Sequence, residues 1–160
     1  MKSFLLSALA TRYRGAPARF AADFPGDWLL WEPGAWIPPG PRTLSFSSNP
    51  SAASAAGASA TLAMVLERGR PQQTLGRDES CDLTINDGTL STRHLALLYR
   101  AEDGWTVEDL GSRNGTLVDG KGLAPGTKVG LKTGTQVVAA QVVLTFLGPE
   151  GLWQRIESAR

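Results

Sequence analysis

The second half of the chain is constrained most by a repeat of two positions, which only β-strands satisfy. Leu62, Met64 and Leu66 alternate with Ala63, Val65 and Glu67. Similar short stretches follow, separated by turns rich in Gly and Asp. Such alternation places successive side chains on opposite faces of a sheet. We expect strands at 62–66, 72–76, 82–86, 94–100, 105–110, 116–119, 128–131, 136–139 and 141–147. Many short strands with no helix between them predict an all-β sandwich.

Three short polar motifs lie where these strands end. They are Gly76-Arg77, Ser91-Thr92-Arg93-His94 and Asp109-Leu110-Gly111-Ser112-Arg113-Asn114-Gly115-Thr116. Arginine offers a permanent charge with a planar fork of donors that suits phosphate. Hydroxyl and amide side chains add short donors, and the glycines let the backbone approach closely. The combination predicts an anion site that is presented on loops.

The three motifs, in this order and at this spacing, resemble the forkhead-associated (FHA) domain, a reader of phosphothreonine peptides. The resemblance is of a bacterial type and covers roughly residues 60–148, more than half of the chain. It implies an FHA-like β-sandwich of two mostly antiparallel sheets. The first sixty residues lie outside the resemblance and form a non-FHA extension.

The resemblance also assigns roles to individual residues. Arg77 would be the main phosphate ligand, Ser91 would donate to a second phosphate oxygen, and Thr92 would touch the phosphate through its side chain or backbone. Arg113 would reach the phosphate or an acidic residue of the ligand. Asn114 would hold the backbone of the ligand.

Other residues of the motifs would support the site. Gly76, His94 and Gly115 would be structural, with the histidine bracing a loop by hydrogen bonding. The loop 86–90, with Thr89, would read the ligand residue three positions beyond the phosphothreonine. Because Thr89 carries no charge, we expect no strong acidic preference there.

Composition excludes several classes of function. A formal net charge of +1 argues against general nucleic-acid binding. The single cysteine, Cys81, and the single histidine, His94, argue against a disulfide framework and against metal sites, and we expect no cofactor. A lone thiol is typical of a reducing compartment, so we expect a cytoplasmic protein. No stretch is long enough to span a membrane, and the apolar start is better read as an amphipathic helix than as a signal peptide.

The organisation expected from composition has four parts. Residues 1–46 form a region rich in Trp and Pro, with short helices at 4–13 and 18–24 and a buried strand or docked segment at 28–31. Residues 47–59 are small and polar and would be a flexible linker. The FHA domain would follow at 60–148. A tail, 149–160, would form one or two helical turns or fray.

Two functions from different classes remain open. The first is a non-catalytic phosphothreonine-binding adaptor in Ser/Thr-kinase signalling, whose partner is a phosphothreonine-containing protein such as a kinase or its substrate. The second is a phospho-independent assembly module that uses the sandwich and the tryptophans between 28 and 36 as interfaces. Those tryptophans would otherwise pack in a satellite core or against the sandwich.

A Ser-His-Asp hydrolase is disfavoured because no oxyanion site or nucleophile elbow is evident. Recognition of the chain's own Thr11 or Thr43, once phosphorylated, is a further hypothesis.

Overall fold

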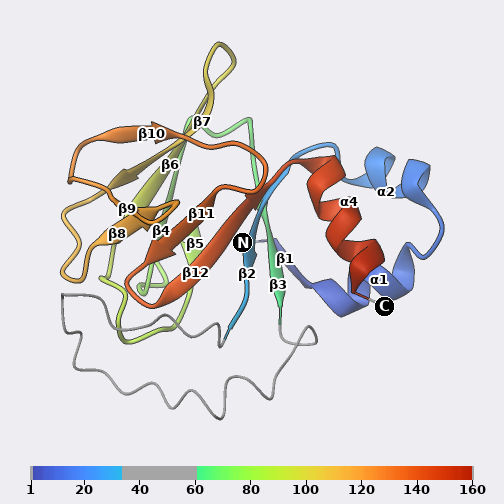
Figure 1. Ribbon diagram of the computed structural model, residues 1–160, viewed down its shortest axis with the longest axis horizontal. Helices are drawn as coiled ribbons and strands as arrows, with labels where there is room; N and C mark the ends of the chain where they lie inside the picture. The colour runs from blue at the N-terminus through green and yellow to red at the C-terminus, as the bar shows by residue number, and fades with distance from the viewer. Residues whose placement is uncertain (1, 34–60, 160) are drawn as a thin grey trace.

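The computed structural model describes residues 2–33 and 61–159, which build two facing β-sheets and a group of helices beside them (Figure 1). The larger sheet has the strand order β1-β3-β2-β12-β11-β8-β9 and the smaller one β10-β7-β6-β4-β5. All described pairings are antiparallel except that of β4 with β5. The strands of the larger sheet are β1 Ser3–Leu5, β2 Asp27–Trp31, β3 Leu62–Leu66, β8 Thr116–Val118, β9 Lys121–Gly122, β11 Gln136–Ala139 and β12 Val142–Leu147. Those of the smaller sheet are β4 Gln72–Gly76, β5 Leu83–Thr84, β6 Leu95–Arg100, β7 Gly104–Asp109 and β10 Lys128–Gly130.

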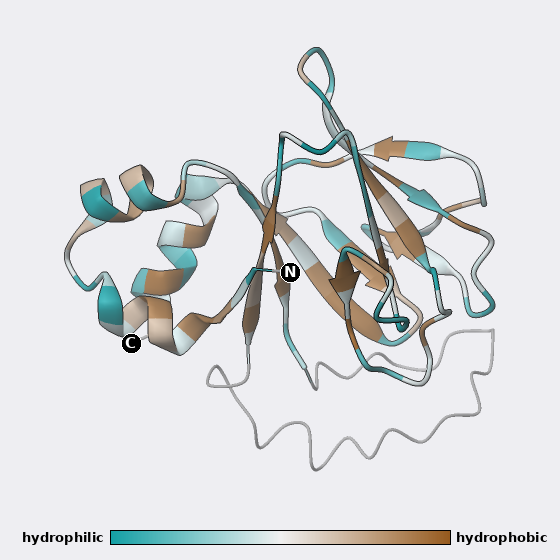
Figure 2. Cartoon of the chain, turned by 180° about the vertical axis from the view of Figure 1, so that it is seen from behind, coloured by the Kyte–Doolittle hydropathy of each residue, from teal (hydrophilic) through white to brown (hydrophobic). Residues whose placement is uncertain are grey.

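The alternation read from the sequence reappears in the structure, where buried and less buried side chains alternate along strands such as β7. In β7, Trp105, Val107 and Asp109 are buried while the residues between them are half-buried. The inward side chains of both sheets form one hydrophobic core that includes Leu75, Leu95 and Leu144. Figure 2 shows the hydrophobic residues concentrated along the strands and hydrophilic ones in many of the connecting turns. The predicted all-β sandwich of two mostly antiparallel sheets is confirmed.

The first thirty residues differ from the expected arrangement, because they contribute strands to the larger sheet. β2 lies between β3 and β12, with Trp31 opposite Leu62 and Trp28 opposite Leu147. The segment 47–59, which composition suggested as a flexible linker, lies outside the described residues. The strands before and after it, β2 and β3, are neighbours in one sheet, which low complexity alone could not show.

Both faces of β2 are buried, which explains its uninterrupted apolar sequence. Leu29 faces the core between the sheets, whereas Trp28 and Leu30 face a second hydrophobic core under the helices. Trp28 is 1% exposed and Trp31 is half-buried against the sandwich core. Two of the three tryptophans considered as an interface are thus packing residues, and Trp36 lies outside the described residues.

The helices cover the part of the larger sheet formed by β2, β3 and the end of β12 (Figure 1). They are α1 Leu6–Arg12, α2 Pro17–Asp23 and α4 Pro149–Ser158. Phe20 packs edge-on against Tyr13, stacks on Trp28 and lies beside Trp153 of α4. The first expected helix begins later than predicted, because residues 3–5 pair with β3 instead. The expected tail is a ten-residue helix, anchored by buried Leu152 and Ile156.

A buried carboxylate joins the two sheets at the end of the sandwich where β2 begins. Asp27 accepts hydrogen bonds from Arg68 Nε at 2.7 Å and from Trp105 Nε1 at 2.8 Å. Trp105 belongs to the smaller sheet and Asp27 to the larger one. Because Asp27 is 5% exposed, these partners, and not water, satisfy its carboxylate oxygens. The strand that sequence analysis placed outside the sandwich therefore also carries a cross-link between its layers.

A chain shortened to residues 60–160 tests this arrangement. It would lack β2, so β3 and β12 would lose the strand between them and Trp105 would lose its acceptor. We expect no cooperative unfolding transition in urea or on heating, whereas the full chain unfolds cooperatively. A shortened chain with a cooperative transition at the midpoint of the full chain would contradict the integral role of β2.

Candidate functional site

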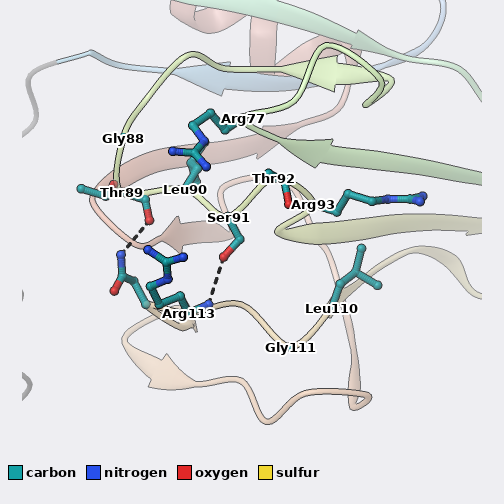
Figure 3. A pocket seen from close by; sticks show the side chains of 11 residues that line it. Arg77, Gly88, Thr89, Leu90, Ser91, Thr92, Arg93, Leu110, Gly111 and Arg113 are labelled. Carbon is teal, nitrogen blue, oxygen red and sulfur yellow. Dashed lines mark hydrogen bonds between the residues drawn. The ribbon is translucent and has the colours of Figure 1, made fainter.

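Three loops meet at the end of the sandwich opposite Asp27 and enclose an open depression of about 410 Å³ (Figure 3). The first loop follows β4, the second precedes β6 and the third follows β7. The five residues predicted to bind the ligand all line this depression: Arg77, Ser91, Thr92, Arg113 and Asn114. Thr89 lines it as well. The structure thus brings together side chains from three separate sequence motifs.

Gly76 lets the first two loops touch. A Cβ at this position would lie 2.3 Å from the carbonyl oxygen of Thr92 and 3.0 Å from the Cα of Arg93. The close approach allows the backbone N–H of Arg77 to donate to the Ser91 carbonyl at 3.0 Å. Only a residue without a side chain permits this contact, so Gly76 fixes the starting point of Arg77.

His94 braces the second and third loops from below. Its Nδ1 accepts from the backbone N–H of Ser91 at 3.1 Å, and its Nε2 donates to the Gly115 carbonyl at 3.0 Å. The ring must therefore be neutral, with its proton on Nε2. The side chain is fully buried, and this burial lowers the pKa of His94, although the Gly115 carbonyl and the charge of Asp109 oppose the shift.

Asp109 orders the third loop, a role that the sequence analysis did not assign. Its Oδ1 accepts from the backbone N–H groups of Gly111 and Ser112, both at 2.8 Å, and its Oδ2 accepts from the hydroxyls of Ser112 and Thr116, both at 2.6 Å. Burial alone would raise the pKa of Asp109, but these hydrogen bonds outweigh it and lower the pKa. The signal available in the sequence was the spacing of Asp109, Ser112 and Thr116 within the motif.

Ser91 and Asn114 keep hydrogen-bonding capacity that faces the depression. The Ser91 hydroxyl accepts from the backbone N–H of Arg113 at 3.0 Å, and among the described residues no acceptor takes its proton. The Asn114 side chain donates to the Thr89 carbonyl at 2.8 Å, which leaves its own carbonyl oxygen and one N–H. Both side chains are thus oriented by the protein and still able to bind a ligand.

The charges of the depression are positive. Arg77 and Arg113 are exposed and both project into the central space, whereas Arg93 extends away from it (Figure 3). Neither Arg77 nor Arg113 forms an ion pair with a described residue, and no acidic residue lines the depression. Thr92 is exposed at the rim, and its carbonyl accepts from Asp78 N–H. The arrangement suits a multiply charged anion.

Thr89 differs from what the specificity prediction requires of its side chain. It is 7% exposed, and its hydroxyl donates to Asp87 Oδ1 at 2.5 Å and accepts from the Gln141 N–H at 3.4 Å. What Thr89 offers to the depression is backbone, next to the exposed Gly88. A contact of Thr89 with a ligand would therefore come from its main-chain atoms.

Comparison with known proteins identifies the family of this region. Residues 73–139 match the model of the FHA domain. The chain contains an FHA domain. This confirms the resemblance read from the three motifs.

The FHA-domain protein FhaB of Mycobacterium tuberculosis is 36% identical over 63 residues, which are 39% of this chain and 40% of FhaB. The match thus spans well under two thirds of that relative. Among solved structures, the FHA domain of CT664 from Chlamydia trachomatis has a TM-score of 0.54 at 16% identity, over 76% of this chain and 96% of that domain. The FHA domain of an Arabidopsis thaliana hypothetical protein has a TM-score of 0.54 at 24% identity, over 78% and 86%. Both likenesses cover more of the chain than residues 73–139.

In residues 2–33 and 61–159, no group of three or more His, Cys, Asp or Glu side chains is arranged to hold a metal ion. None of the helices in these ranges has the length and apolarity needed to cross a membrane.

Substitution of Gly76 by Ala tests the contact between the loops. The added Cβ would meet backbone atoms of Thr92, which cannot move aside as a flexible side chain does. We expect the free energy of unfolding to fall by about 1–3 kcal/mol, the usual cost of overpacking. Gly130→Ala on β10 is the control, because its Cβ meets nothing within 4 Å. Equal stability of the two variants in urea titrations would contradict the argument.

Protonation of His94 gives a second test. The folded protein lowers the pKa of this ring, so the unfolded chain, with a pKa of about 6.5, binds more protons at mildly acidic pH. The stabilisation from neutral His94 is therefore complete above about pH 6.5 and is lost as the pH falls towards the folded pKa. Because the chain has one histidine, we expect His94→Gln to remove most of the slope of unfolding free energy between pH 7.5 and 5. The same slope in both proteins would show that His94 is not buried as a neutral ring.

Proposed function

We propose that this chain is a non-catalytic adaptor that binds phosphothreonine-containing segments of partner proteins. The observation that carries the proposal is the pair of exposed guanidinium groups of Arg77 and Arg113, which form no ion pair with a described residue and face the same space beside the Ser91 hydroxyl. An FHA domain whose site residues had been lost or covered would not present this arrangement.

The phosphate supplies what the depression lacks. Phosphorylation adds roughly −1.5 to −2 charges and three acceptor oxygens at neutral pH. Arg77 would bind two of these oxygens through its planar fork, and Ser91 and Arg113 would share the third. Charge-assisted bonds of this kind distinguish a phosphorylated from an unmodified peptide. The adjacent Asn114 would then hold the ligand backbone, with the loop 86–90 facing the residues that follow the phosphothreonine.

The geometry supports binding without chemistry. The contact between Ser91 and His94 runs through the backbone N–H of Ser91 and not through its hydroxyl. His94 is buried, and both of its ring nitrogens are engaged, so it cannot accept a proton from Ser91 Oγ. The pair therefore lacks the base that a serine nucleophile needs.

Partners and location follow from the ligand class. A phosphothreonine reader serves Ser/Thr-kinase signalling, so the partner would be a kinase or a kinase substrate in the cytoplasm. The alternative, a phospho-independent assembly module, would be favoured by a blocked Arg77, which is instead exposed. It would also be favoured by an exposed tryptophan cluster, whereas Trp28 is buried.

Recognition of the chain's own Thr11 is disfavoured by its setting. Thr11 lies in α1, and its hydroxyl donates to the Ser7 carbonyl at 3.0 Å. Presentation of this threonine to a site on loops would require the helix to unwind. Thr43 lies outside the described residues.

Binding of a phosphothreonine-peptide library, with phosphoserine and unphosphorylated controls, tests the proposal. We expect Arg77→Ala to weaken binding by about tenfold to a hundredfold, because a hydrogen bond to a charged group contributes about 1.5–3 kcal/mol. Arg113→Ala should weaken binding less and reduce its dependence on salt. Affinity should also fall below about pH 6, where the phosphate takes up its second proton.

Arg100→Ala is the matched control, since Arg100 is an exposed arginine at the other end of β6. It should bind as the wild type does. Binding that ignores phosphorylation, or an Arg77→Ala variant that binds normally, would reject the phosphopeptide function and leave the assembly module as the better explanation.

A further inference from the structure

One side chain in the depression does not fit a purely anionic ligand. Leu110 lines the depression and is 38% exposed, among residues that are otherwise mostly polar or charged. It is one of three large hydrophobic side chains that are exposed in residues 2–33 and 61–159, with Leu5 and Leu117. Single exposed leucines are common on protein surfaces, so exposure alone assigns no role. The evidence for a role is the position of Leu110 within the depression.

The backbone of Leu110 is held in place by the same contacts that build the site. Its N–H donates to the His94 carbonyl at 3.0 Å. The preceding residue, Asp109, has a buried carboxylate that accepts hydrogen bonds from the N–H groups of the two following residues, Gly111 and Ser112. These bonds close a tight turn around Leu110. Gly111 permits this turn through its φ of 80°. An apolar side chain on such a fixed backbone loses little entropy when a ligand covers it.

Leu110 also lies at a distinct end of the depression. In Figure 3 the labelled side chains run from Thr89 on the left, past Arg77, Arg113 and Ser91 in the middle, to Leu110 and Arg93 on the right. A phosphate held between the two arginines leaves the chain of the ligand free to continue in both directions. One direction leads to Asn114 and the loop 86–90, and the opposite direction leads past Leu110.

We propose that Leu110 is a specificity residue that contacts an aliphatic side chain of the ligand, within the few residues that precede the phosphothreonine. The inference rests on the proposed function, which orients the residues after the phosphothreonine towards the loop 86–90. An extended peptide advances about 3.3 Å per residue, so up to three positions before the phosphothreonine can reach a neighbouring surface. The ligand class is thus a phosphothreonine peptide with Leu, Ile, Val or Met on its amino-terminal side.

The test uses phosphothreonine peptides randomised at the three positions before and the four positions after the modified residue. Wild type should select aliphatic residues before the phosphothreonine. Leu110→Ala should lose this selection, with a fall of about tenfold in affinity for the best aliphatic peptide, and should still require the phosphate. Leu110→Glu should select Lys or Arg at the same position, a change that a merely structural role of Leu110 would not produce.

Leu117→Ala is the matched control. Leu117 is 39% exposed on β8 and does not line the depression, so this variant should keep the wild-type selection. The inference is overturned if wild type shows no aliphatic selection before the phosphothreonine, or if Leu110→Ala and Leu110→Glu keep the wild-type selection. Those results leave phosphate-dependent binding intact. Failure of the proposed function would be distinct, because binding would then be indifferent to phosphorylation in the wild type itself.

Discussion

The buried imidazole of His94 is the contact on which the site depends. One nitrogen accepts from Ser91 and the other donates to the Gly115 carbonyl, so a single ring sets the distance between the loop before β6 and the loop after β7. Asp109 acts from the adjacent strand end, where its buried carboxylate binds the turn that carries Arg113 and Asn114. Polar groups buried in this way are costly unless each finds a partner, and here each finds one. The loops are therefore as well defined as the strands from which they extend, which is what a binding site on loops requires.

Because buried groups hold the loops, the positive charges at the surface of the site are not needed for the stability of the loops. Arg77 and Arg113 have no carboxylate partner among the described residues, yet both are exposed, so water and salt screen them. Exposed ion pairs contribute little to folding, and their absence costs the protein little stability. The polar groups that stabilise the loops lie underneath, and the groups available to a ligand lie above them. A change of Arg77 should thus alter binding with little effect on folding, whereas a change of His94 should alter both.

The sequence predicted what is local in this structure and missed what depends on distant pairing. Strands such as β7 follow from their own alternation, and the site residues follow from motifs that each occupy a single loop. β2 was harder because Trp28-Leu29-Leu30-Trp31 is apolar on both faces, so it shows no period of two. Its place between β3 and β12 is decided by partners far away in the chain. Thr89 illustrates the same limit, because only the fold brings the N–H of the distant Gln141 to its hydroxyl.

Different side chains hold the two ends of the sandwich. The contacts that join the sheets therefore lie apart from the loops that form the candidate site. At one end Asp27 joins the sheets through Arg68 and Trp105, beside strands covered by the aromatic layer of α1, α2 and α4. At the other end His94 and Asp109 join the loops. β6 and β7 connect the two ends as a rigid antiparallel pair. The side chains that these loops expose, such as Leu110 and Arg113, belong to neither hydrophobic core, so a change in them leaves the cores intact. The added strands and helices therefore stabilise a platform whose opposite end presents the exposed side chains of the candidate site.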